Sequence, residues 1–190
     1  RISHVFALDV PAYGKPLIVT DAAINIQPTL DHKRDICQNA VDLLRTLGVD
    51  KPRVAVLAAV ETVNAKMPAT LDAAALTVMA ARGQIAGALV DGPLAFDNAI
   101  SIAAARIKGI VSDVAGEADI LLVPDLEAGN MLAKQLIYFA GATAAGIVLG
   151  ARVPIVLTSR SDPLSARIAS AALAKLLVCR GKQSMPGTAA

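Results

Sequence analysis

Short runs of consecutive apolar residues alternate with longer helix-like segments along most of this chain, and this alternation restricts the fold more than any other feature. The runs are RVAVLAAV (53–60), GALVDG (87–92), ADILLVPD (118–125) and VPIVLTS (153–159). Strands that are apolar at almost every position suit a parallel sheet that is covered on both faces. Two further strands, HVFALDV (4–10) and KPLIVTD (15–21), are joined by a short loop, so we expect them to be neighbours.

Five helix-like segments separate or follow these strands, at 29–48, 69–83, 94–109, 127–146 and 163–179. In the first segment an apolar stripe recurs at helical spacing from Ile36 to Leu47, and Gly48 is suited to end the helix. The glycines of GATAAG (141–146) follow a helical pattern and lack dinucleotide-binding spacing, so we assign them to close helix packing. The sequence therefore predicts an α/β protein with three layers, α/β/α, around a largely parallel sheet.

Composition excludes several classes of function. Hydrophobic residues make up 55% of the chain, which is enough for a substantial core, whereas aromatic residues make up 3% and the net charge is only +2. These values argue against a protein that stacks nucleic-acid bases. The longest uncharged segment, residues 135–151, is broken by glycines and is shorter than the ~20 apolar residues of a membrane span. No secretory signal peptide is recognisable, and we expect a cytoplasmic protein without a membrane or nucleic-acid partner.

The cysteines and histidines are too scattered to indicate a metal site or a catalytic triad. Cys37 and Cys179 both fall within apolar helical patterns, so we expect two reduced thiols in the core. His4 and His32 stand far from other metal-ligating residues, so we expect each to be structural or to lie on the surface. No CxxC motif or histidine cluster predicts zinc.

Three polar loops follow apolar runs, and each of them leads into a helix. They are DGPLAFDN, PDLEAGN and TSRSDP. Ligands of open α/β sheets bind at the carboxyl ends of the strands, so we expect these loops to meet at one edge of the sheet.

TSRSDP has the strongest chemistry of the three loops. Asp162 followed by Pro163 predicts a helix start, with Asp162 as the N-cap and Pro163 as the first helical residue. This role leaves Ser159 and Arg160 unexplained. An arginine beside a helix N-terminus can bind an anion, and the serine hydroxyl can donate to a developing oxyanion.

The other two loops have both structural and functional interpretations. Gly129 allows close approach of a ligand, Asn130 offers a donor and an acceptor, and Lys134 follows one helical turn later. The alternative is an ordinary strand–helix connection with a solvated lysine. Asp91 lies at a strand end, where it could act as an acid, a base or a ligand-orienting group, but Asp91-Gly92-Pro93 also has ordinary turn chemistry.

Taken together and in this order, three segments resemble the phosphate acetyltransferase/phosphate butyryltransferase family. They are ALVDGPLAFDNAIS, SDVAGEADILLVPDLEAGNMLAKQL and GARVPIVLTSRSD, and the earlier VTDAAINIQPTLDHK is also similar. The resemblance implies a two-domain α/β fold similar to isocitrate and isopropylmalate dehydrogenases, with the active site between the domains of a homodimer. It identifies residues 1–150 as the middle domain and 151–190 as the returning C-terminal part of the first domain, the rest of which would precede Arg1.

The resemblance also implies the reaction and its residues. The family transfers an acyl group between CoA and inorganic phosphate by direct attack of the CoA thiolate on an acyl phosphate, with no metal and no tightly bound cofactor. Ser159 would polarise the acyl carbonyl and Arg160 would hold the phosphate, with Asp162 as the nearest carboxylate. By the same resemblance, the side chains that would line the cleft and bind the substrates belong to Asp91, Asp125, Gly129, Asn130 and Lys134.

Two positions depart from the acetyl-type pattern of that family. Ala166 stands where the acetyl enzymes place an aspartate proposed as the base, and Tyr138 stands where they place an arginine. Both departures resemble the butyryl-type branch. They also leave open a non-catalytic module that senses acyl-CoA or mediates dimerisation within a larger enzyme. A dehydrogenase of the same broad fold ranks lower, because no metal-binding aspartate cluster is visible.

Overall fold

A seven-stranded mixed sheet in the order β4-β3-β5-β2-β1-β6-β7 forms the centre of the computed structural model, which describes residues 1–183. The strands are β1 (Ser3–Asp9), β2 (Leu17–Thr20), β3 (Arg53–Leu57), β4 (Leu89–Leu94), β5 (Ile120–Leu122), β6 (Thr143–Leu149) and β7 (Ile155–Val156). Strands β4, β3, β5 and β2 are parallel, whereas β1, β6 and β7 continue the sheet by antiparallel pairing. The short loop between β1 and β2 requires their antiparallel pairing.

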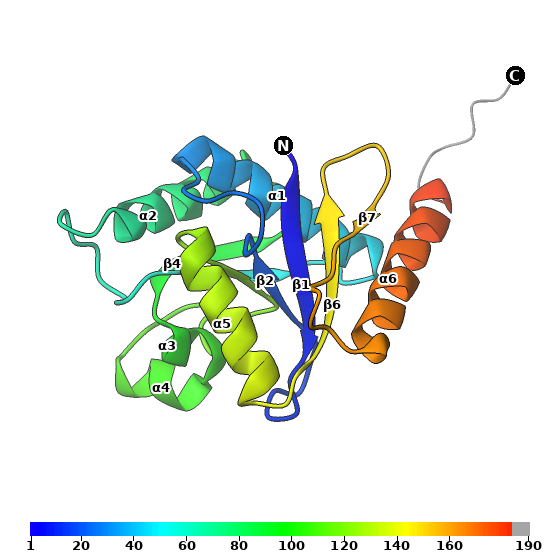
Figure 1. Ribbon diagram of the computed structural model, residues 1–190. Helices are drawn as coiled ribbons and strands as arrows, with labels where there is room; N and C mark the ends of the chain where they lie inside the picture. Colours follow the sequence, from blue (N-terminus) through cyan, green and yellow to red (C-terminus); the bar gives the residue numbers. More distant parts are fainter. Residues whose placement is uncertain (184–190) are drawn as a thin grey trace, which may run out of the picture.

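Helices cover both faces of the sheet, so the predicted α/β class with three layers is confirmed (Figure 1). One core packs the sheet against α1 (Leu30–Thr46), α2 (Pro68–Ala81) and α6 (Leu164–Gln183). The other core lies beneath α3 (Phe96–Ile100) and α5 (Leu126–Tyr138), and α4 (Ile102–Ile107) packs against α3. Helix α1 begins one residue inside the predicted segment 29–48, and Thr29 and His32 form a capping box at its N-terminus.

The prediction of a helix over 127–146 is wrong after Tyr138. Helix α5 ends at Tyr138, Gly141 adopts a φ of 68°, and Thr143–Leu149 forms strand β6 between β1 and β7. Alanine favours helices, but Ala145, Ile147 and Val148 are buried within the sheet, and this packing overrides local propensity. Gly146 therefore belongs to a strand, and its assignment to helix packing is wrong.

Three smaller expectations also need correction. The helix predicted over 94–109 is divided at Ser101, whose hydroxyl accepts a hydrogen bond from the backbone N–H of Ala104 and caps α4. The strand predicted over 153–159 contains only two residues in β-structure. Cys37 is a buried free thiol as expected, but Cys179 is exposed on α6 rather than in the core.

The segment after residue 150 is joined to the rest of the sheet. Strand β7 pairs with β6, and α6 packs on β6. The division of the chain at residue 150 stays a prediction. Within residues 1–183, no helix combines the length and apolar character needed to cross a membrane, and no three metal-ligating side chains gather at one point.

Candidate active site

Asp21 organises the loop that leaves the C-terminal end of β2. Its side chain is 3% exposed, and its Oδ1 accepts hydrogen bonds from the backbone N–H groups of Ala23 and Ile24, both at 3.0 Å. The other oxygen accepts from the backbone N–H of Asn25 at 3.2 Å. Sequence reasoning did not single out Asp21, although an aspartate directly after the apolar run LIVT is a signal for such a turn.

The N-terminus of α5 packs directly against this loop. Asp125 caps the helix by accepting a hydrogen bond from the N–H of Ala128 at 2.8 Å. Gly129 is buried, and a Cβ at this position would lie 2.7 Å from Val123 Cγ2. The Asn130 amide donates to the carbonyl of Ala22 at 3.1 Å. Of the predicted site residues, Gly129 and Asn130 therefore hold α5 against the loop that follows β2, and Asp125 caps the helix.

Lys134 lies one helical turn beyond Asn130 and is exposed. Among residues 1–183 its ammonium group has no hydrogen-bond or ion-pair partner. Of the predicted residues on α5, Lys134 is thus the one whose charge remains available to an anionic ligand.

The segment after β7 forms a tight turn that presents Ser159 and Arg160 to solvent. The backbone N–H of Ser159 donates to Asp162 Oδ2 at 2.6 Å, and the hydroxyl groups of Ser159 and Ser161 lie 3.0 Å apart. The Arg160 guanidinium has no hydrogen bond or ion pair within the described chain, although its carbonyl accepts from Arg167 at 3.4 Å. The turn therefore offers a free cation beside a hydroxyl group.

The predicted helix start at Asp162 is displaced by one residue. Helix α6 begins at Leu164, and the Pro163 carbonyl accepts from the N–H groups of Ala166 and Arg167 at 3.1 and 3.3 Å. Pro163 therefore occupies the capping position, and Asp162 uses its carboxylate to close the turn on Ser159. Ala166 is 5% exposed, so that position faces the interior rather than the turn.

His4 lies between the two loops. The side chain is 1% exposed on β1, and its ring meets Phe6 edge to face, with ring centroids 4.5 Å apart. Burial lowers the pKa of His4, while the Asp21 carboxylate, the Leu157 carbonyl and the Asp162 carboxylate oppose this shift. The sequence predicted that His4 is structural or lies on the surface, and it did not indicate that His4 faces carboxylates from both loops.

Asp91 does not join this arrangement, and the expectation that the three loops meet at one edge is wrong. Strands β4 and β7 are the two edge strands, six spacings or about 29 Å apart. Strand β7 also runs opposite to β2, β3, β4 and β5, so the rule for carboxyl ends does not place its loop with theirs. Asp91 Oδ1 accepts from the N–H of Gly92 at 2.8 Å, which is ordinary turn chemistry.

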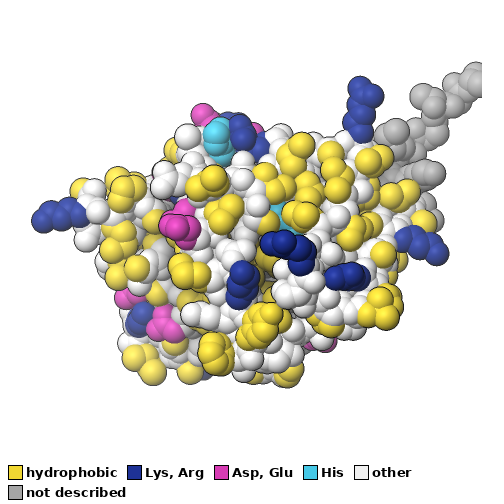
Figure 2. Space-filling view, in the orientation of Figure 1, with side chains coloured by type: hydrophobic (Ala, Val, Ile, Leu, Met, Phe, Trp, Pro, Cys, Tyr) yellow, Lys and Arg dark blue, Asp and Glu magenta, His cyan; other side chains and the backbone are white. Residues whose placement is uncertain are grey.

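The face that carries α5 is rich in cations. In Figure 2, Lys and Arg side chains gather over α5, β1 and the segment that follows β7, with few acidic side chains among them. A surface of this kind favours a small anionic ligand.

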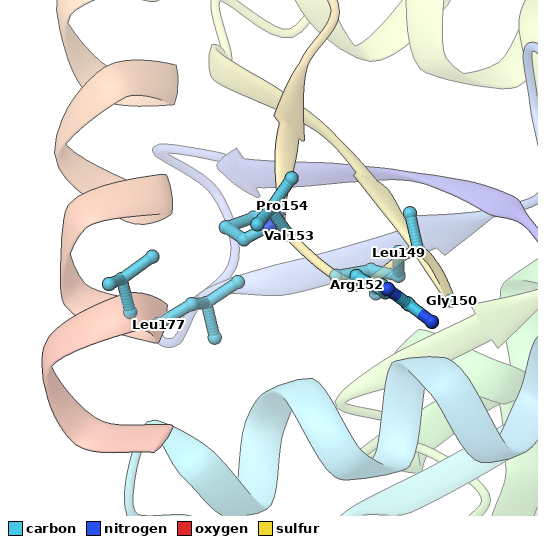
Figure 3. Close-up of a pocket in the computed structure, with 8 residues that line it drawn as sticks. Leu149, Gly150, Arg152, Val153, Pro154 and Leu177 are labelled. Carbon is cyan, nitrogen blue, oxygen red and sulfur yellow. The ribbon is translucent and has the colours of Figure 1, made fainter. Parts of the chain in front are cut away.

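An apolar cavity of about 390 Å³ lies elsewhere, between the turn that precedes β7 and the C-terminal half of α6. Leu149, Val153, Pro154 and Leu177 line it, and Arg152 extends away from Leu177 (Figure 3). Among the described residues that line it, Arg152 is the one that carries a charge, and none of them is an acid, a base or a nucleophile.

Several known proteins are similar to this chain. Residues 1–175 match the phosphate acetyl/butaryl transferase family. A phosphate acetyltransferase of Rhizobium meliloti is 64% identical over 180 residues, which are 95% of this chain and 57% of that protein. A probable phosphate butyryltransferase of Bacillus subtilis is 55% identical over 173 residues, covering 91% of this chain and 58% of that protein.

A solved structure, that of a branched-chain phosphotransacylase from Enterococcus faecalis V583, superposes with a TM-score of 0.87 and 39% identity over 94% of this chain and 63% of that one. The chain spans 57% and 58% of the length of the two curated relatives named above, and 51% of the length of a further one. With the family match extending over residues 1–175, the chain belongs to the phosphate acetyl/butaryl transferase family.

Proposed function

We propose that the full-length protein transfers a short acyl group, acetyl or butyryl, between CoA and inorganic phosphate. In the direction of thioester formation, the CoA thiolate attacks the carbonyl carbon of the acyl phosphate. The sulfur–carbon bond forms, the bond between that carbon and the phosphate oxygen breaks, and phosphate leaves. The names of the relatives support the acetyl and butyryl groups as substrates. The reaction requires no metal and no tightly bound cofactor.

One observation supports the assignment of this reaction to particular residues. The Arg160 guanidinium is exposed and unpaired within the described chain, next to the Ser159 hydroxyl on a turn closed by Asp162. A guanidinium binds phosphate oxygens through two parallel hydrogen bonds, and a hydroxyl donor stabilises charge on a carbonyl oxygen. We assign phosphate binding to Arg160 and polarisation of the acyl carbonyl to Ser159. Lys134 is the further cation that binds the CoA or phosphate substrate.

The test is CoA-dependent turnover of acetyl phosphate and butyryl phosphate by the full-length protein. We expect thioester formation with at least one of them, and an Arg160→Ala variant to lose about 10²–10³-fold in rate, as expected for one lost anion-stabilising group. Arg152→Ala is the matched control, because Arg152 is an exposed arginine at the apolar cavity. Absence of thioester with every short acyl phosphate would contradict the function. Normal turnover by Arg160→Ala would remove Arg160 from the site.

A second candidate is a non-catalytic module that binds acyl-CoA. The observation that favours it is the lack of a free carboxylate at the turn to take the thiol proton. The Asp162 carboxylate accepts a hydrogen bond from the backbone N–H of Ser159, and the buried Ala166 has no carboxylate. Calorimetry separates the two functions: acyl-CoA binding without turnover in the full-length protein supports the module.

We further propose that the protein is a cytoplasmic homodimer without nucleic-acid or membrane partners. Light scattering on the full-length protein tests the dimer, and a monomer at micromolar concentration contradicts it.

A further inference from the structure

The imidazole of His4 is a buried polar group that the proposed chemistry does not use. It is 1% exposed, and its Nδ1 has no hydrogen-bond partner among the described residues. Buried polar atoms are nearly always paired, so an unpaired one needs an explanation. An apolar side chain could fill the same space without leaving a nitrogen unsatisfied. The contacts of the other ring nitrogen should therefore provide the reason for a histidine here.

The other nitrogen, Nε2, lies where three strands come close together. Gly146 of β6 pairs with Phe6 of β1, and the Leu157 N–H, just past β7, donates to the Gly146 carbonyl at 3.4 Å. A Cβ on Gly146 would lie 3.1 Å from His4 Nε2 and would collide with the Leu157 carbonyl oxygen. The missing side chain at residue 146 thus lets the imidazole and this carbonyl approach each other.

The protonation of the ring fits a contact with that carbonyl. Burial lowers the pKa of His4, which favours the neutral imidazole, and a neutral imidazole has one donor and one acceptor nitrogen. The Leu157 carbonyl accepts only, so Nε2 is the donor and the unpartnered Nδ1 is the acceptor. Leu157 lies two residues before Ser159, at the start of the turn that carries the proposed site.

We propose that His4 is a positioning residue, whose Nε2–H holds the Leu157 carbonyl and thereby fixes the turn that carries Ser159 and Arg160. Its effect on turnover rests on the proposed acyltransferase function, whereas its effect on the turn does not. His4 is not the group that takes the thiol proton, because its ring is buried away from any substrate.

Two conservative variants separate the ring nitrogens. The side-chain amide of glutamine places its nitrogen near the position of Nε2, so His4→Gln keeps a donor for Leu157. Asparagine reaches only the position of Nδ1, so His4→Asn loses that donor. Ser3→Ala is the matched control, because Ser3 is also fully buried on β1 but points to the opposite face, where its hydroxyl accepts from Asn39 at 2.9 Å.

Two measurements on the full-length protein report on the proposal. Hydrogen–deuterium exchange of the peptide that covers 155–163 should accelerate about ten-fold in His4→Asn, as expected for one lost hydrogen bond, and remain near wild type in His4→Gln and Ser3→Ala. The kcat for CoA and acyl phosphate should fall by about ten-fold or more in His4→Asn with little change in the KM for CoA, and His4→Gln should recover it.

Each outcome decides part of the proposal. Unchanged exchange in His4→Asn, or equal acceleration in His4→Gln or Ser3→Ala, overturns the contact between Nε2 and Leu157. Accelerated exchange with unchanged kcat overturns the link to catalysis. If the wild-type protein forms no thioester, the acyltransferase function fails, and exchange alone still decides whether His4 holds the turn.

Discussion

Substitution of Gly129 by alanine separates two explanations for this glycine on α5. One explanation is that the missing side chain lets a ligand approach the backbone. The other is that α5 packs so closely on the loop after β2 that no Cβ fits. The surroundings of Gly129 favour the second, because a Cβ would lie 2.7 Å from Val123 Cγ2, 3.0 Å from Ala22 Cβ and 3.1 Å from the Asp21 carbonyl oxygen.

The two explanations predict opposite changes in the free energy of unfolding. Alanine inside a helix is favoured over glycine by about 1 kcal/mol, which stabilises the variant if space is available. Overpacking a tight contact costs about 1–3 kcal/mol, and neither the branched Val123 nor the backbone of Asp21 is a flexible side-chain end that can move aside. The balance is a net loss of about 1 kcal/mol.

Denaturant unfolding of Gly129→Ala measures this balance. The matched control is Gly14→Ala, because a Cβ at Gly14 would meet no atom within 4 Å, and this variant should be neutral or gain up to about 1 kcal/mol. A Gly129→Ala protein that is at least as stable as wild type refutes the packing argument. If that stable protein is also inactive, the ligand-approach explanation replaces it.

Three further predictions concern groups outside the Ser159 turn. Asp125→Ala should lose about 1 kcal/mol of stability through the lost helix cap, whereas Asp125→Ser should restore the cap; if turnover also recovers in Asp125→Ser, its carboxylate does not bind substrate. Burial, followed by the Asp119 carboxylate, raises the pKa of Tyr13 to about 12. The stabilisation by its neutral phenol is therefore complete below about pH 10 and is lost as the pH rises towards 12. Ultraviolet titration against Tyr13→Phe should show this shift, and a titration midpoint near pH 10 contradicts it. Burial raises the pKa of Cys37 to about 12, so a thiol reagent should modify only Cys179 in the native protein, and rapid modification of a Cys179→Ser variant without denaturant would show that Cys37 is accessible.

The parts of the fold that sequence predicts well are those in which local and global preferences agree. Helix α1 has an apolar stripe, a capping threonine and a terminal glycine, and it forms within two residues of the predicted bounds. The apolar runs of β3 and β5 lie inside the sheet because their residues are covered on both faces. In these segments the spacing of the apolar residues is enough to predict which side chains are buried in the fold.

Strand β6 shows where this agreement ends. Its sequence, TAAGIVL, combines helix-favouring alanines with strand-favouring Ile147 and Val148, and it directly follows a true helix. The choice is made by β1, which pairs with seven consecutive residues of β6, and by α6, which packs on it. Because these partners are distant in the sequence, the local pattern of residues does not predict that this segment forms a strand.

The site fails to assemble as predicted for a related reason, which is strand direction. The three loops were expected to meet because each follows an apolar run. The sequence of such a run does not reveal the direction of its strand within the sheet. Strand β7 points opposite to β2, and its loop approaches the Asp21 loop through the face of the sheet, where His4 lies between them. Asp91 and Ser159 follow similar runs at opposite edges. The residue types of Ser159 and Arg160 are therefore enough to propose an anion site, whereas the proposed contact that fixes their turn joins His4 of β1 to Leu157, which lies more than 150 residues later in the sequence.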